Sequence, residues 1–248
     1  MSTLAWMTAR PIAHRGLHDM NSCVWENTST AFDRAIASGY NIECDLQITS
    51  DNMPVVFHDY KTDRLCNVEG VVKEMTAAEL KKLTIGSSGE HPQTLKDMLR
   101  QVDDRTGLVI ELKPQSDCLT TVFATAVLED LNEYIGRVAL MSFDANLILE
   151  LIRLGSPWPV GLTAEAHSDY GLHLDEDILD SGVRFVSFHV ADLPHTFVDH
   201  AKARGLPVIT WTVRTEQQLE LTYRHADQIT FEGFDPDMQH SREQRASG

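Results

Sequence analysis

Short apolar runs recur along the chain, and most are followed by a stretch whose apolar residues repeat at helical spacing. The runs predict nine strands, at residues 11–15, 41–46, 54–59, 108–113, 137–143, 160–164, 185–190, 207–213 and 228–232. The stretches predict helices at residues 28–38, 118–131, 145–154, 175–180, 196–204 and 216–224. This alternation indicates an α/β protein with a parallel sheet, and a closed TIM (β/α)8 barrel fits it best. Eight strands complete such a barrel, so one of the nine is surplus.

Two places interrupt the alternation. Too few residues separate 41–46 from 54–59 for a crossover helix, so the chain must return there in extended form. The segment 60–106 is longer than one connecting helix requires, and it predicts helices only at 76–83 and 94–101. We therefore expect a single domain over residues 1–248, with a small inserted subdomain at about residues 60–106 on the rim of the barrel.

The charge balance narrows the range of partners. Lys and Arg number 21 against 37 Asp and Glu, which gives a net charge of −16 with histidine neutral, and no basic cluster offsets it. Binding to nucleic acid or to an anionic membrane through charge is therefore disfavoured. The sequence leaves a homo-oligomer open.

Features that would direct the chain to a membrane or out of the cell are weak. No window holds 18 consecutive apolar residues, and the first eight residues lack the basic segment and apolar run of a signal peptide. The spacing of the cysteines at positions 23, 44, 66 and 118 fits neither a zinc knuckle nor a redox pair. We therefore expect free thiols in a cytoplasmic protein without a stable membrane anchor.

Three carboxylates are predicted to converge at one end of the barrel. Side chains alternate along a strand, so Glu43 and Asp45 share one face, and Glu111 and Lys113 share a face of a later strand. Charged residues at the C-terminal ends of barrel strands face the active-site mouth. Converging carboxylates repel one another unless a cation lies among them, and their oxygen atoms favour one hard divalent ion, Mg²⁺, Ca²⁺ or Mn²⁺, over Zn²⁺. The alternative is a set of ion-paired rim residues.

Two histidines are predicted at the same end of the barrel, because His14 follows the first strand and His58 follows the third. Imidazole titrates near neutral pH, so the pair can serve as general base and general acid, although a lone histidine is more often structural. Arg15 offers a fork of donors suited to phosphate oxygens, and Gly16 permits close approach to the backbone. The sequence holds no serine nucleophile elbow and no P-loop lysine motif.

Several short motifs follow one another along the chain. They are His14-Arg15-Gly16, Glu26-Asn27-Thr28, Glu43-Cys44-Asp45, His58-Asp59, Asp63-Arg64, Glu111-Leu112-Lys113 and Trp211-Thr212-Val213. In this order, over residues 11–213, the chain resembles the glycerophosphodiester phosphodiesterase family. The resemblance implies a TIM barrel with a small inserted subdomain, and hydrolysis of glycerophosphodiesters to glycerol 3-phosphate and an alcohol.

The resemblance also implies roles for single residues. It places one divalent metal ion on Glu43, Asp45 and Glu111, and it makes His14 and His58 the acid/base pair. Substrate binding is implied for the remaining motif residues, Arg15, Glu26, Asn27, Lys113 and Trp211, with the arginine and the lysine on the phosphate. The alternative for Trp211 is a place in the core.

The chain departs from the family pattern near its end. Arg214 stands where the family often has Asn, and Phe231-Glu232-Gly233 replaces the usual Thr-Asp pair, so we expect the alcohol side of the pocket to differ. We expect a surface or structural role for His189, and position alone makes neither His18 nor Cys23 catalytic.

The expected mechanism leaves some alternatives open. Metal and cationic side chains would stabilise the charge on the phosphate while the histidines transfer protons, and the nucleophile is either water or the glycerol 2-hydroxyl. One alternative function is a phospholipase-like phosphodiesterase acting on lysolipids, which the net charge of −16 disfavours. Another is a barrel that binds glycerophosphodiesters without turnover, for which an acid/base pair has no use.

Overall fold

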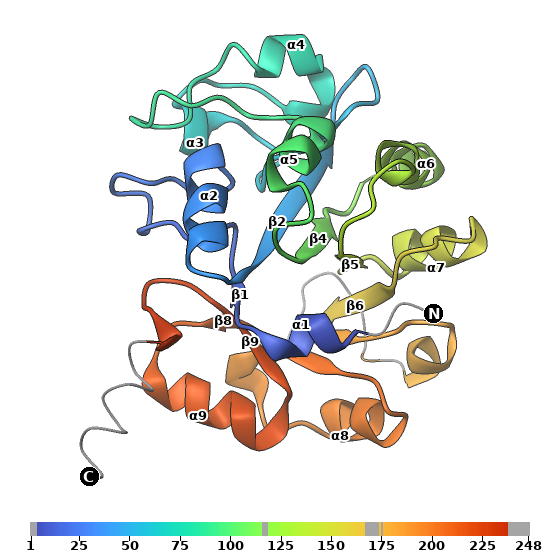
Figure 1. Cartoon of the computed structure of the whole chain (residues 1–248). Coiled ribbons are helices and arrows are strands. Elements are labelled where there is room, and N and C mark those ends of the chain that lie inside the picture. Colours follow the sequence, from blue (N-terminus) through green and yellow to red (C-terminus); the bar gives the residue numbers. More distant parts are fainter. Residues whose placement is uncertain (1–3, 116–118, 167–173, 175, 238–248) are drawn as a thin grey trace, which may run out of the picture.

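The structure, a computed structural model, describes residues 4–115, 119–166, 174 and 176–237 (Figure 1). Eight parallel strands close into a barrel in the order β1, β9, β8, β7, β6, β5, β4, β2, and β1 pairs with β2 to complete the circle. These strands are β1 Ile12–Ala13, β2 Asn41–Ile48, β4 Leu108–Leu112, β5 Val138–Ser142, β6 Val160–Ala164, β7 Val186–His189, β8 Val208–Val213 and β9 Gln228–Phe231. The prediction of a TIM barrel is confirmed.

The surplus strand is β3, Pro54–Val56, which lies outside the parallel set. It runs antiparallel to β2, with Leu46 opposite Val56 and Ile48 opposite Pro54. Asn52 in the connecting turn has a φ of 61°, a left-handed conformation that asparagine tolerates. The extended return inferred from the short connection is therefore present, and it carries the chain back toward the mouth of the barrel.

Helices pack around the strands. The α-helices are α1 Ala5–Ala9, α2 Ser29–Ala37, α3 Asp63–Cys66, α4 Ala77–Leu80, α5 Leu95–Val102, α6 Thr120–Leu131, α7 Ala145–Arg153, α8 Thr196–Ala203 and α9 Glu216–His225. Shorter 3₁₀ helices are η1 Val72–Glu74, η3 Glu176–Asp180 and η4 Val190–Asp192. The predicted helix at 175–180 is thus a 3₁₀ turn. Cys118 and Asp175, where two helices were predicted to begin, lie outside the described residues.

Threonine side chains fix the starts of several helices. The Thr28 hydroxyl accepts a hydrogen bond from the backbone N–H of Ala31 at the start of α2. Thr94 and Asp97 form a reciprocal capping box at the start of α5. Such caps satisfy N–H groups that have no partner within the helix, so these residues set where each helix begins.

The barrel interior holds an apolar layer beneath the polar mouth. Met7 of α1 packs there with inward-facing residues, among them Val109 of β4, Phe185 directly before β7 and Ile209 of β8. Because side chains alternate along β4, Glu111 faces the same way as Val109 but lies closer to the C-terminal end of the strand. Outward-facing residues such as Cys44 belong to the larger core between strands and helices. The charged side chains at the mouth of the barrel therefore lie above an apolar interior layer.

The chain between β3 and α5 has a small apolar cluster of its own, in which Leu65, Val72, Leu80 and Ile85 pack with Phe57. Figure 1 shows α3 and α4 on the outer side of this part of the chain. By contrast α5, which also lies within residues 60–106, contacts α2 and α6 and takes a place in the ring of helices.

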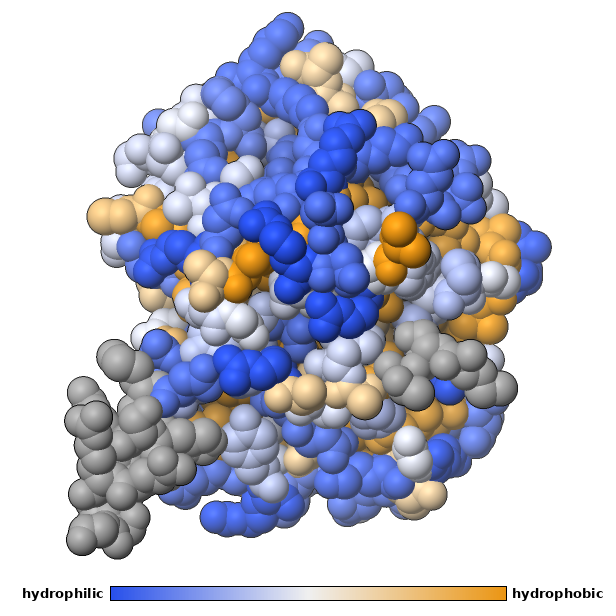
Figure 2. All heavy atoms as spheres, viewed as in Figure 1, coloured by the Kyte–Doolittle hydropathy of each residue, from blue (hydrophilic) through white to orange (hydrophobic). Residues whose placement is uncertain are grey.

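Figure 2 shows mostly hydrophilic side chains on the viewed face, with apolar side chains in scattered positions. Of the helices within the described residues, none combines the length and apolar character needed to cross a bilayer.

Candidate active site

The three predicted carboxylates meet at the C-terminal mouth of the barrel. Glu43 and Asp45 come from β2 and Glu111 from the neighbouring β4, where it pairs in register with Asp45. All three are buried, and one oxygen from each lies within 4.8 Å of the others. The Lys113 ammonium lies 2.8 Å from Asp45 Oδ1 and also contacts Glu111. The cluster therefore contains three acidic side chains and the positively charged side chain of Lys113.

Burial and charge act differently on two of these acids. Burial raises the pKa of Glu43 well above its ordinary value, and the charges of Asp45 and Glu111 raise it further. Burial also opposes ionisation of Asp45, but Lys113 and the other positive groups nearby hold the pKa of that carboxyl well below its usual range. Glu43 Oε1 is buried without a hydrogen-bond partner. An orphaned oxygen within an all-oxygen donor set fits a hard divalent cation, so this cluster could hold a metal.

Arg15 lies directly against this cluster, in a left-handed conformation with a φ of 53°. Its backbone N–H donates to Glu43 Oε2 at 2.9 Å, and its Nε lies 3.2 Å from Asp45 Oδ2. Asn27 reinforces this arrangement, because its backbone N–H donates to the Arg15 carbonyl and its amide donates to Asp45 Oδ2, each at 2.9 Å. Gly16 is required next to Arg15, since its φ is 79° and an added Cβ would lie 2.8 Å from a side chain of α2.

Glu26 connects two arginines. Its carboxylate accepts hydrogen bonds from Arg15 at 2.7 Å, from Asn21 at 2.7 Å and from both terminal nitrogens of Arg64 at 2.8 Å. Burial alone would raise the pKa of Glu26, but the Arg64 hydrogen bonds and the Arg15 charge lower it to about 2. Both of its oxygens are thus engaged by donors. Glu26 and Asn27 lie behind the cavity wall and orient residues that are on it.

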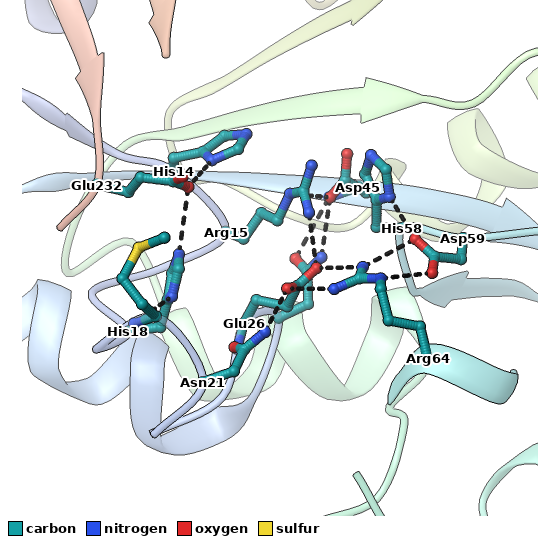
Figure 3. Close-up of polar contacts among 12 residues, drawn as sticks. His14, Arg15, His18, Asn21, Glu26, Asp45, His58, Asp59, Arg64 and Glu232 are labelled. Atoms are coloured by element: carbon teal, nitrogen blue, oxygen red, sulfur yellow. Dashed lines mark hydrogen bonds and ion pairs between the residues drawn. The ribbon is translucent and has the colours of Figure 1, made fainter. Parts of the chain in front are cut away.

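His14 faces the cavity and is held from behind by Glu232, a residue of the segment after β9 (Figure 3). Its Nδ1 contacts Glu232 Oε2, and the other oxygen of that carboxylate accepts a hydrogen bond from Arg214 Nε at 2.8 Å. Burial lowers the pKa of His14 to about 4, and the Arg15 charge acts in the same direction. Burial opposes ionisation of Glu232, but the hydrogen bond from His14 and the nearby His18 bring its pKa below the ordinary value. His14 is therefore neutral at pH 7 beside an ionised carboxylate.

His58 has a similar support built from nearby residues. Its Nδ1 lies 2.6 Å from Asp59 Oδ1, and Arg64 binds both oxygens of Asp59 at 2.7 and 2.8 Å. Figure 3 shows Arg64 between Asp59 and Glu26, joining the His58 side of the site to Arg15. Each histidine is thus backed by a carboxylate, and each carboxylate is bound by an arginine.

A cavity of about 490 Å³ opens between the two histidines. It is lined by His14, Arg15, His58, Asp59, Tyr60, Glu111, Lys113, Pro114, Phe143, Glu165, His189, Trp211, Thr212 and Arg214. The Trp211 ring meets Phe143 edge to face at a centroid distance of 5.3 Å and lies 4.9 Å from the His189 ring. The volume suits a small polar ligand with one apolar face, which the aromatic wall can contact.

The comparisons with known proteins agree with this geometry. Residues 14–235 match the Glycerophosphoryl diester phosphodiesterase family. The chain belongs to this family. It is 32% identical over 233 residues to the glycerophosphodiester phosphodiesterase of Caldanaerobacter subterraneus, with 84% of this chain and 87% of the relative covered. The predictions of the family and of an enzyme of this kind are confirmed.

Solved structures share the fold. A glycerophosphodiester phosphodiesterase from Parabacteroides distasonis superposes with a TM-score of 0.79 at 25% identity, covering 96% of this chain and 98% of the other. A phosphodiesterase from Oleispira antarctica, solved with its product sn-glycerol-3-phosphate, superposes with a TM-score of 0.81 at 24% identity and covers 96% of this chain and 98% of its own.

Sequence analysis missed the residues that support the two histidines. Glu232 appears in the sequence only as a departure from the usual pattern, and His18 has no motif that marks it. Asp59 and Arg64 belong to recognisable motifs, which was a usable signal, but the motifs do not reveal that they bind each other. The predicted residues His14, Arg15, His58, Glu111, Lys113 and Trp211 all line one cavity.

Proposed function

We propose that this chain hydrolyses glycerophosphodiesters to glycerol 3-phosphate and an alcohol in a reaction that requires one divalent cation and uses His14 and His58 as base and acid. The observation that carries the proposal is the placement of both histidines on one cavity, beside three buried carboxylates and two cationic side chains. The product bound to the Oleispira antarctica relative, sn-glycerol-3-phosphate, supports the same substrate class.

Glu43, Asp45 and Glu111 would hold the cation, which is Mg²⁺ or Ca²⁺, with Mn²⁺ as a further candidate for an all-oxygen site. When bound, it supplies positive charge to the phosphate oxygens and orients the diester. Lys113 shares these carboxylates, so it lies where it can bind a phosphate oxygen and keep the cluster from being uniformly negative. Arg15 presents its guanidinium from the opposite side of Asp45.

The two histidines divide the proton transfers. His14 enters neutral, so it can accept a proton from the attacking oxygen, which then forms a bond to phosphorus. His58 carries a proton into the reaction and gives it to the leaving alcohol oxygen as the second P–O bond breaks. If the nucleophile is water, glycerol 3-phosphate forms directly. If it is the glycerol 2-hydroxyl, a cyclic phosphate forms first and water opens it with the histidine roles reversed.

The cavity walls support a small glycerol-bearing substrate. Trp211 and Phe143 form an apolar corner against which the carbon face of glycerol can rest.

Free thiols at Cys23, Cys44 and Cys66 support a reducing, cytoplasmic setting, since none of these described cysteines is paired.

A head-group and metal assay tests the proposal. Purified protein is incubated with glycerophosphocholine, glycerophosphoethanolamine or lysophosphatidylcholine, with Mg²⁺ or Ca²⁺ and then with chelator. We expect metal-dependent release of glycerol 3-phosphate from the first two substrates and loss of this activity in Glu111→Gln. The exposed Glu69→Gln is the matched control and should retain it. Preferential turnover of lysophosphatidylcholine would favour the lysolipid alternative, and binding without turnover would contradict the proposal.

A further inference from the structure

Three side chains converge on the Glu232 carboxylate, and Figure 3 shows two of them, His14 and His18. His14 Nδ1 contacts Oε2, and His18 Nε2 lies 3.5 Å from the same oxygen. Arg214 binds the other oxygen, Oε1, with Nε at 2.8 Å and a terminal nitrogen at 2.6 Å. The carboxylate itself is only 7% exposed. Its two oxygens are therefore divided, one for the arginine and one for the two imidazoles.

Hydrogen-bond chemistry fixes the proton positions on both rings. An ionised carboxylate can only accept, so the His14 nitrogen that contacts it, Nδ1, carries the ring proton. The remaining nitrogen of the neutral ring, Nε2, then has a free lone pair. It lies 3.9 Å from Glu43 Oε2, beyond hydrogen-bond distance.

His18 is oriented by the backbone in the same way. Its Nδ1 accepts a hydrogen bond from the Met20 N–H at 3.1 Å, so in the neutral ring the proton is on Nε2. That nitrogen lies 3.5 Å from Glu232 Oε2, close enough for electrostatic attraction but without the geometry of a hydrogen bond. The His18 side chain is 4% exposed, which leaves the ring little access to water and makes the carboxylate its available acceptor.

We propose that Glu232 is a positioning residue that keeps the proton of His14 on Nδ1 and its lone pair on Nε2 toward the substrate, and that His18 and Arg214 hold Glu232 in the orientation that does so. The inference rests on the proposed role of His14 as a base. A base needs a lone pair on the nitrogen that faces the substrate, and the opposite tautomer would present an N–H there instead.

Glu232→Gln tests this with almost no change of shape. Arg214 can only donate, so it should bind the oxygen of the new amide and leave the amide NH₂ facing His14. His14 Nδ1 would then have to accept, and the ring proton should move to Nε2. We expect long-range ¹H–¹⁵N spectra of ¹⁵N-histidine-labelled protein to show the Nδ1–H form of His14 in the wild type and the Nε2–H form in Glu232→Gln. His58, bound to Asp59, is an internal control whose signal should not change.

Kinetics provide the second readout. In Glu232→Gln we expect kcat to fall by about 10- to 100-fold, the range typical of partners that orient a functional histidine, with KM nearly unchanged. Glu232→Asp, which retains the charge, should recover part of the loss, and Glu69→Gln should lose nothing. If Glu232→Gln does not fold, Arg214→Gln serves instead, because Arg214 is half exposed and its loss should leave His14 in a mixture of tautomers.

The outcomes separate this inference from the proposed function. Persistence of the Nδ1–H form in the variant, or an unchanged kcat where His14→Ala is impaired, would overturn the role of Glu232. An active His14→Ala would instead show that the proposed role of His14 is wrong.

Discussion

The two histidines of the site share one chemical arrangement but are built from opposite kinds of contact. His14 is 12% exposed and is supported by Glu232, which lies 218 residues away in the chain. His58 is 30% exposed and is supported by the adjacent residue, Asp59. Both carboxylates are bound by arginines, Arg214 in the first case and Arg64 in the second.

The difference matches the two tasks proposed for the histidines. Burial and the nearby Arg15 charge keep His14 neutral, which suits a residue that accepts a proton. His58 is the more exposed of the two and lies closer to solvent. The comparison also shows that the long-range pair depends on closure of the barrel, whereas the local pair does not.

The largest expected effect comes from removing either histidine. His14→Ala and His58→Ala should each lower kcat by at least ~10²–10⁴-fold, the contribution typical of general acid–base catalysis. A substrate with p-nitrophenol as the leaving group should restore much of the rate to His58→Ala alone, because that oxygen leaves without a proton. Circular dichroism verifies folding. Rescue of His14→Ala instead would reverse the two roles.

A pH series on Glu26 tests the link between Arg15 and the His58 side. The pKa of Glu26 lies near 2 in the folded protein against an ordinary 4.5, so its ionised form stabilises the fold above pH 4.5, and this contribution is lost as the pH falls toward 2. The shift corresponds to roughly 3 kcal/mol at neutral pH. Urea denaturation should show Glu26→Gln less stable than wild type at pH 7, with the gap narrowing at pH 4.5 and below. If the difference in unfolding free energy between wild type and Glu26→Gln did not change with pH, the ion pairs of Glu26 would not be its cause.

Metal binding should act on the centre between the two histidines. A cation that binds only the native state adds about 2.7 kcal/mol at a hundredfold excess over Kd, and in a chain of this size this raises Tm by roughly 5–10 °C. Chelator should lower Tm and abolish activity, while Glu43→Gln and Glu111→Gln should respond less to Mg²⁺, Ca²⁺ or Mn²⁺. Equal shifts in wild type and both variants would place the ion elsewhere.

The smallest effect is expected from Arg64, which supports His58 indirectly. Arg64→Gln removes charged hydrogen bonds to Asp59 and Glu26 and should reduce kcat by about tenfold, because Arg64 acts on His58 only through Asp59. Arg153→Gln, which breaks an exposed ion pair to Glu150 on α7, is the matched control. Steady-state kinetics measure kcat for both variants. If Arg64→Gln and Arg153→Gln have the same kcat, Arg64 does not support His58.

Much of this molecule follows from local sequence pattern. Period-two alternation put Glu43 and Asp45 on one face, and the strand–helix order predicted the barrel. The short connection before residue 54 predicted the extended return of β3. Each of these features depends on residues close together in the sequence, and regular backbone geometry determines how such residues are placed.

Features that depend on distant residues were not predictable in the same way. The Glu232 contact requires the register between β1 and β9, where Ala13 pairs with Phe231, and no spacing in the sequence encodes it. The η3 turn has too few residues for its apolar spacing to distinguish a 3₁₀ helix from an α-helix. The double use of Glu26 by Arg15 and Arg64 likewise arises only after folding.

Strand β1 closes the barrel between β9 and β2, so the site cannot be complete until β9 has been synthesised. The acidic cluster comes from two strands in the first half of the chain, so all of its residues leave the ribosome before the second half of the barrel is made. His14 leaves earlier still, yet its carboxylate partner is among the last described residues to emerge. Such a high sequence separation slows folding, because the connecting chain must be ordered before the contact can form. The three carboxylates proposed to hold the cation are thus synthesised well before the carboxylate that contacts the proposed base, and the segment after the last strand brings that carboxylate into place.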